Sequence, residues 1–132
     1  MKPLPYSPPP AEDNKLAYLV ENDIDLLGIM QKAHHPKAGG IVLFSGEVRN
    51  HHNEKHVTHL EYEVYIPLAE KMIQMIVSDA KEKWQLHFAH CTHRIGIVSI
   101  CESAVVVVTA HAHRKEAYEA NKYIIDLSLI HI

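Results

Sequence analysis

The chain has 132 residues, enough for one domain with its own hydrophobic core. Thirteen basic side chains against 16 acidic ones give a net charge of −3, which argues against a nucleic-acid-binding module that works through bulk charge. The best apolar run, Ala104–Ala110, is too short to cross a membrane, and prolines stand where a secretion signal needs an apolar run. We therefore expect a cytoplasmic protein that binds neither nucleic acid nor membrane.

The chain opens with a proline-rich segment. Five prolines lie between Pro3 and Pro10, and such a composition favours an extended conformation with little apolar content to bury. We interpret residues 1–13 as a flexible tail and residues 14–132 as a single domain.

The domain begins with a short strand and a helix. Lys15–Val20 alternates weakly and predicts a strand. Asn22 or Asp23 can cap the helix that follows. We expect this helix to end at His35-Pro36, because a residue before proline avoids the helical region.

Two alternating segments follow. Gly39-Gly40 predicts a turn, and Ile41–Val48 alternates as a strand does. Asn50–His56 is polar and predicts a loop before a second strand at Val57–Tyr65.

A long helix follows, with Pro67 as its first residue and its end near Trp84. Its inward stripe is predicted to consist of Leu68, Met72, Met75, Ile76 and Ala80.

The last third predicts three strands and a helix. Leu86–Cys91 and Ile97–Ile100 are short strands around a bend at Ile95-Gly96-Ile97. Ala104–Ala110 is a Val/Ala run typical of a strand buried on both faces, and Arg114–Asp126 is a helix. Interleaved strands and helices indicate an α+β or α/β domain with helices packed on a sheet.

Histidine is unusually frequent, at 12 residues, so a metal site must be considered. His111-x-His113 and Cys91-x-His93 have a spacing that a strand permits, but a structural zinc site usually shows two recognisable ligand pairs. No CxxC, HExxH or HxxxH pattern is present. We therefore expect no metal site and mostly solvated histidines.

Two further pairs could carry chemistry, and for both we favour a structural role. Cys91 and Cys101 lie away from helix N-termini, where a thiolate is stabilised, and are expected to be buried thiols. Glu61 and Glu63 share one strand face and could serve in acid–base chemistry, but pairing with basic side chains is favoured.

The strongest local feature is His113-Arg114, directly after the buried strand and at the start of a helix. Free backbone N–H groups and the helix dipole favour an anion there. Arg49 ends another predicted strand, and His93-Arg94 repeats the pair at a third. The sequence therefore predicts a site for a phosphate or carboxylate on which Arg49, His113 and Arg114 converge.

Four motifs together cover about two-thirds of the chain. They are Gly39-Gly40-Ile41-Val42-Leu43-Phe44-Ser45-Gly46-Glu47-Val48-Arg49-Asn50, then Leu60-Glu61-Tyr62-Glu63-Val64-Tyr65 followed by Pro67-Leu68-Ala69-Glu70-Lys71, then His93-Arg94-Ile95-Gly96, and last His113-Arg114-Lys115-Glu116-Ala117-Tyr118-Glu119-Ala120. In their order and spacing these motifs resemble the large, catalytic subunit of molybdopterin synthase.

The resemblance implies an α+β fold with a mixed or antiparallel sheet and a ferredoxin-like (α/β-hammerhead) core. It implies a homodimer that binds a ubiquitin-like sulfur-carrier subunit, whose thiocarboxylate supplies two sulfurs to cyclic pyranopterin monophosphate. The product is the dithiolene of molybdopterin, and no cofactor is implied. By position, Arg49, His113 and Arg114 would form the substrate-binding wall.

The chain departs from the family at its C-terminus. Family members carry lysines there that are thought to anchor the thiocarboxylate, and Leu129 stands where the first of these lysines is expected. The apolar segment Leu127–Ile132 is unlike a natural helix end. We therefore expect a gene fragment that lacks the family's C-terminal segment and has little activity.

Three functional hypotheses follow. The first is the sulfur-transferring enzyme, and the second is a catalytically impaired fragment that still binds the carrier as a scaffold. The third, less favoured, is a histidine-rich metal-binding domain.

Overall fold

The computed structural model describes residues 16–52 and 55–130, which form three helices and eight strands. The helices are α1 (Leu26–Ala33), α2 (Ile66–Trp84) and α3 (Arg114–Ile130). The strands are β1 (Leu19–Val20), β2 (Gly40–Glu47), β3 (His51–His52), β4 (Lys55–His56), β5 (His59–Tyr62), β6 (Phe88–Arg94), β7 (Gly96–Ser99) and β8 (Ser103–His111).

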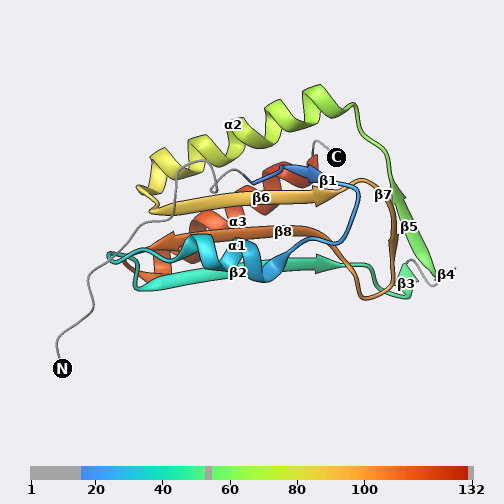
Figure 1. Cartoon of the computed structure of the whole chain (residues 1–132), viewed down its shortest axis with the longest axis horizontal. Coiled ribbons are helices and arrows are strands. Elements are labelled where there is room, and N and C mark those ends of the chain that lie inside the picture. The colour runs from blue at the N-terminus through green and yellow to red at the C-terminus, as the bar shows by residue number, and fades with distance from the viewer. Residues whose placement is uncertain (1–15, 53–54, 131–132) are drawn as a thin grey trace.

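Four strands form the central sheet in the order β1-β6-β8-β2. β8 lies antiparallel to both neighbours, whereas β1 pairs with β6 in parallel. In the β2–β8 pair, Gly40 lies opposite His111 and Glu47 lies opposite Ser103. These registers place the start of β2 and the end of β8 at the same end of the sheet (Figure 1).

Helices cover both faces of this sheet. Val105 and Val107 of β8 join the core formed with α2 and α3, whereas Val106 and Val108 face α1 on the other side. Figure 1 shows α1 in front of the sheet and α3 behind it. The prediction that this strand is buried on both faces is confirmed, and so is the α+β class. The ferredoxin-like detail of the fold stays a prediction.

Buried polar contacts fix α3 to the sheet. Asn121 Nδ2 donates to the carbonyl oxygens of Val42 and Val107, at 3.1 and 3.0 Å, and thus bridges β2 and β8. Thr109 Oγ1 donates to the carbonyl of Ala117 at 2.7 Å. Because these groups are buried, their geometry determines where α3 lies along β8.

The remaining strands make two small sheets, β3–β4 and β5–β7, at the far end of the central sheet (Figure 1). Val98 of β7 packs with Val48 and Ala104, so the β5–β7 sheet is attached through a small core of its own. The hairpin β3–β4 lies in the segment Asn50–His56, which was predicted as a loop. The residues that pair across its two strands are polar, so the sequence shows no alternation of apolar residues that would predict a strand.

Several predicted boundaries differ from those observed. The first strand is only Leu19–Val20, and Asp25, rather than Asn22 or Asp23, caps α1 by accepting the N–H of Gly28 at 3.0 Å. β5 is shorter than the predicted Val57–Tyr65. β6 reaches Arg94, and α3 runs four residues beyond Asp126. The predicted tail, residues 1–13, lies outside the described residues, and the single-domain boundary stays a prediction.

The prediction of which α2 residues face inward is partly wrong. Leu68 and Met75 are about half exposed, and the buried side chains are Ala69, Ile73, Ile76, Val77 and Ala80. The buried face is therefore rotated from the predicted one. No helix among the described residues has the length and apolarity needed to cross a bilayer, and the cytoplasmic location stays a prediction.

Candidate functional site

His113 and Arg114 lie at the start of α3, where the chain turns from the end of β8 into the helix. Both side chains are exposed. The turn packs tightly on two glycines: a Cβ on Gly39 would lie 2.7 Å from the carbonyl oxygen of Ala112, and one on Gly40 would lie 3.1 Å from Arg114 Cα. The glycines therefore let the start of β2 approach the start of α3 closely.

A row of imidazoles adjoins this helix start. The ring centroids are 4.5 Å apart for His35 and His87, 6.3 Å for His87 and His111, and 5.8 Å for His111 and His113. Loss of hydration, and then the neighbouring rings of His35 and His111, lower the pKa of His87. At neutral pH this ring is therefore an uncharged member of the row.

The row is not arranged as a metal site. His35 and His87 stack nearly face to face, with 10° between their planes. A metal ion lies close to the plane of each imidazole that binds it, so two stacked rings cannot share one ion. Among the described residues, no group of three or more His, Cys, Asp or Glu side chains is placed to hold a metal.

Arg49 lies at the other end of the sheet. Arg49 follows the end of β2. Arg114, in contrast, lies next to Gly40, at the start of β2. Gly40 and Glu47 are seven positions apart in β2, or about 23 Å along the strand. Arg49 therefore does not meet His113 and Arg114 within one chain. The pairing of β2 with β8 is antiparallel, so the ends of these two strands point in opposite directions.

Leu129 lies in the last turn of α3, with 55% of its surface exposed. α3 runs back along β8, so this turn lies at the same end of the sheet as Arg49 (Figure 1). Lys122, two turns earlier, is about 10 Å away along the helix axis. Its Nζ is 2.6 Å from Asp126 Oδ2, and both side chains of this ion pair are exposed on the outside of the helix.

His93 and Arg94 do not belong to an anion site. Burial lowers the pKa of His93 to about 4, so this ring is uncharged at neutral pH. Arg94 is 7% exposed and pairs with Asp23 at 3.1 Å and with Glu102 at 3.5 Å. It also donates to the carbonyls of Glu21 and Ile97. The suggestion that the His93-Arg94 pair could serve as a third cationic strand end is therefore wrong: Arg94 joins β6 to the loops around it.

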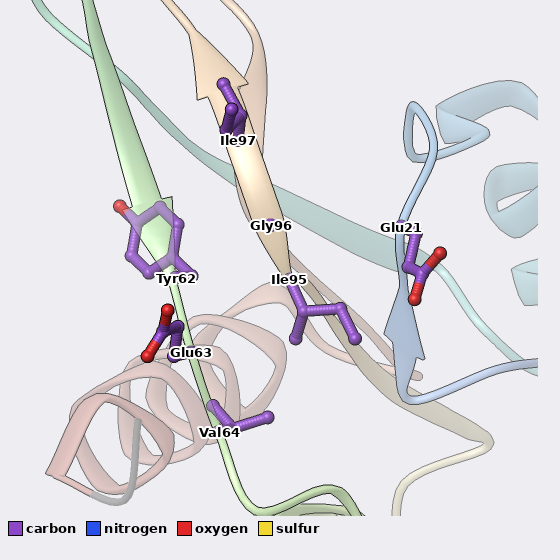
Figure 2. A pocket seen from close by; sticks show the side chains of 7 residues that line it. All are labelled: Glu21, Tyr62, Glu63, Val64, Ile95, Gly96 and Ile97. Carbon is purple, nitrogen blue, oxygen red and sulfur yellow. The ribbon is translucent and has the colours of Figure 1, made fainter.

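A pocket of about 560 Å³ opens beside this arginine, between β5, β7 and the end of β1 (Figure 2). The carboxylates of Glu21 and Glu63 and the ring of Tyr62 line it, together with Val64, Ile95, Gly96 and Ile97. None of these lining residues is basic, so the pocket does not suit a phosphate. It is therefore distinct from the helix start that carries His113 and Arg114.

The two cysteines differ in environment. Cys91 is buried, as expected, and burial raises the pKa of its thiol to about 12. Cys101 was also expected to be buried, but it is exposed, on a turn where its φ is +68°.

This difference predicts selective thiol labelling. Because the thiolate is the reactive form, we expect iodoacetamide at pH 8 to modify Cys101 in the folded protein and Cys91 only after denaturation. Mass spectrometry of the labelled protein, with and without urea, measures this. Equal labelling of both thiols in native buffer would contradict the burial of Cys91.

Comparison with known proteins identifies the family. The family model described as MoaE protein matches residues 19–128. The chain belongs to the MoaE family. The molybdopterin synthase catalytic subunit of Thermoplasma volcanium is 41% identical over 113 residues, which cover 86% of this chain and 82% of that protein.

Solved structures agree with this assignment. Molybdopterin synthase from Staphylococcus aureus matches with a TM-score of 0.80 and 34% identity over 84% of this chain and 81% of that one. A Helicobacter pylori complex of subunits 1 and 2 of molybdopterin-converting factor shares the fold, with a TM-score of 0.68 and 22% identity over 82% and 73% of the two chains.

Membership of the MoaE family confirms the resemblance seen in the sequence, the enzyme class and the role in molybdenum cofactor biosynthesis. The scaffold and metal-binding hypotheses are not favoured. Sequence reasoning located His113 and Arg114 at a helix start, but it missed Glu116, whose carboxylate lies beside His111. An acidic residue in the first turn of a helix is so common that it gives no signal of a special role.

Proposed function

We propose that this chain transfers sulfur from a thiocarboxylated small carrier subunit to cyclic pyranopterin monophosphate and so forms molybdopterin. The observation that carries this proposal is the exposed His113-Arg114 pair at the start of α3. The phosphate of the precursor is the group that such a site suits, because the guanidinium can bind two of its oxygens while backbone N–H groups bind others.

The complete site is proposed to form between two copies of the chain. Arg49 and Arg114 lie at opposite ends of the central sheet, so one chain offers only half of the expected cationic wall at either end. In a symmetric dimer, the Arg49 end of each chain can lie against the Arg114 end of its partner. Such a dimer has two equivalent pockets, each with Arg49 from one chain and Arg114 from the other. This arrangement supports the homodimer expected from the family resemblance.

The carrier is proposed to approach at the Arg49 end. The Helicobacter pylori complex joins two subunits, and it supports a small-subunit partner for this chain. Leu129 lies at this end, at the position where the family resemblance places a lysine for the thiocarboxylate. In a dimer, the thiocarboxylate from one side and the phosphate held by His113 and Arg114 of the partner would share one pocket.

Complementation between two variants tests the shared site. Arg49→Ala and Arg114→Ala are each expected to bind the precursor at least tenfold more weakly than the unaltered chain. When equal amounts are unfolded together and refolded, half of the dimers contain one copy of each. Each such dimer has one intact pocket of two, so about a quarter of the precursor sites should regain full affinity.

Equilibrium dialysis with the precursor counts these sites. If no sites return on mixing, the two arginines act in the same chain or do not share a pocket. A mixture of Arg114→Ala with His113→Ala serves as the control and should restore nothing, because both residues belong to the same half.

A further inference from the structure

His111, at the end of β8, lies between two groups that compete for one atom. Its Nδ1 is 2.9 Å from the backbone nitrogen of His113 and accepts that N–H. The same Nδ1 is 3.7 Å from Glu116 Oε2, in the first turn of α3. The side chains of His111 and Glu116 are only 15% and 33% exposed, so water screens this arrangement poorly.

Glu116 lacks a hydrogen bond where it needs one. Its Oε2 atom is buried and has no hydrogen-bond partner among the described residues. A buried carboxylate oxygen without a donor is costly, and a protonated His111 Nδ1, 3.7 Å away, could serve it with a small movement.

The two contacts of Nδ1 exclude each other. To accept the His113 N–H, Nδ1 must carry a lone pair, which places the proton of the neutral ring on Nε2. To reach Glu116, Nδ1 must carry a proton, because a carboxylate only accepts. The presence or absence of a proton on Nδ1 therefore decides which partner His111 holds, and in the imidazolium Nδ1 always carries one.

We propose that His111 is a positioning residue for the anion site, and that its protonation transfers Nδ1 from the His113 amide to Glu116. The released N–H of His113 then becomes a further donor at the start of α3, beside Arg114. This inference rests on the proposed function only in taking the helix start as the substrate's phosphate site.

Charged and titratable groups face the ring of His111 from several elements. Glu116 favours the imidazolium, and it is the acidic group that faces the ring from α3. The rings of His87 and His113, which lie in the loops before β6 and α3, disfavour the imidazolium. His35 and Lys37 act on His87 behind them. From β2, the residue opposite His111 is Gly40, which adds no charge.

The direction of the effect follows from these contacts. Above the titration range of histidine, the His113 N–H is occupied and unavailable to a ligand. Below it, the amide is free, and both imidazoles add positive charge near the ligand. Anion affinity should therefore rise with acidification more steeply than one titrating histidine allows.

Sulfate is the probe for binding, because it remains a dianion over this range whereas phosphate titrates. We expect the unaltered chain to bind sulfate about tenfold more tightly at pH 6 than at pH 8, at a constant ionic strength set with chloride. In His111→Asn, the Asn oxygen can accept the i+2 N–H without titrating. This variant should retain only the smaller pH effect of His113.

A second readout does not need a ligand. The amide resonance of His113, followed by NMR without sulfate, should shift between pH 8 and pH 6 in the unaltered chain. It should stay fixed in His111→Asn, and in Glu116→Gln its midpoint should move to lower pH. His56→Asn, on the exposed β4 strand, is the matched control and should change nothing.

The two readouts separate the two proposals. A His113 amide that titrates as described in a protein that does not bind sulfate would overturn the anion site and leave the exchange of partners intact. An amide that ignores pH, or that titrates equally in His111→Asn, would overturn the role of His111.

Discussion

Replacing Leu129 by lysine is expected to raise the rate of sulfur transfer by this chain about a hundredfold, because a preorganised charge at the reacting group commonly contributes that much. The ammonium would pair with the thiocarboxylate and offset the negative charge that develops as sulfur leaves it. The site accepts this change readily, since Leu129 is 55% exposed in the last turn of α3. Lys122 does not replace it, because it lies two helical turns earlier, about 10 Å away along the helix axis.

The measurement is a single-turnover assay with thiocarboxylated carrier and precursor, run on the two chains in parallel. Leu27→Lys is the control, because Leu27 is 77% exposed on α1 and the change adds the same charge away from the proposed pocket. A rate gain in Leu27→Lys as large as in Leu129→Lys, or none in either, would show that a lysine at 129 has no special role.

Replacing Arg94 by methionine is expected to lower the free energy of unfolding by about 3 kcal/mol. Methionine can fill the buried space, but it leaves Asp23 and Glu102 without their cation and the carbonyls of Glu21 and Ile97 without a donor. Urea unfolding followed by circular dichroism measures the loss. Arg114→Met serves as the control and should change stability by less than about 0.5 kcal/mol, since Arg114 is exposed.

Acidification tests the contacts of Glu102, of which Arg94 is one. The N–H of Ser99 first of all, and Arg94 to a smaller degree, hold the pKa of Glu102 below its ordinary value. A carboxyl group with a lowered pKa stabilises the fold at neutral pH, and this contribution is lost as the pH falls through its titration range. Stability should therefore decline less on acidification in Glu102→Gln than in the unaltered chain. An equal decline in both would contradict the contacts of Glu102 with the Ser99 N–H and with Arg94.

The sequence predicted best where one physical signal dominates. The valine run of β8 has no polar side that could face water, so its burial between two layers of helices followed from composition alone. The phase of α2 could not be fixed in the same way. Leu68 and Met75 are apolar but remain about half exposed, and only packing against β6 and α3 selects the face that carries Ile73 and Val77.

Prediction of the site from the sequence has the same limit. The His113-Arg114 pair was located because a helix start has a local signature of its own. The position of Arg49 depends on the direction in which β2 pairs with β8, and strands so far apart in the sequence carry no local sign of that direction. The contact of His111 with Glu116 depends on a turn of the backbone, and it could be found only in the structure.

The place of β8 in the sheet also constrains how the chain can fold during synthesis. In the central sheet, β2 pairs only with β8, and β6 pairs with the two-residue β1 and with β8. About 55 residues separate the end of β2 from the start of β8, so this contact closes a long loop, which is slow. While the ribosome is still making β8, the edge of β2 has no partner in this sheet. A nascent chain at that stage therefore exposes unpaired backbone groups along the edge of β2, which makes it a candidate for chaperone binding until β8 emerges.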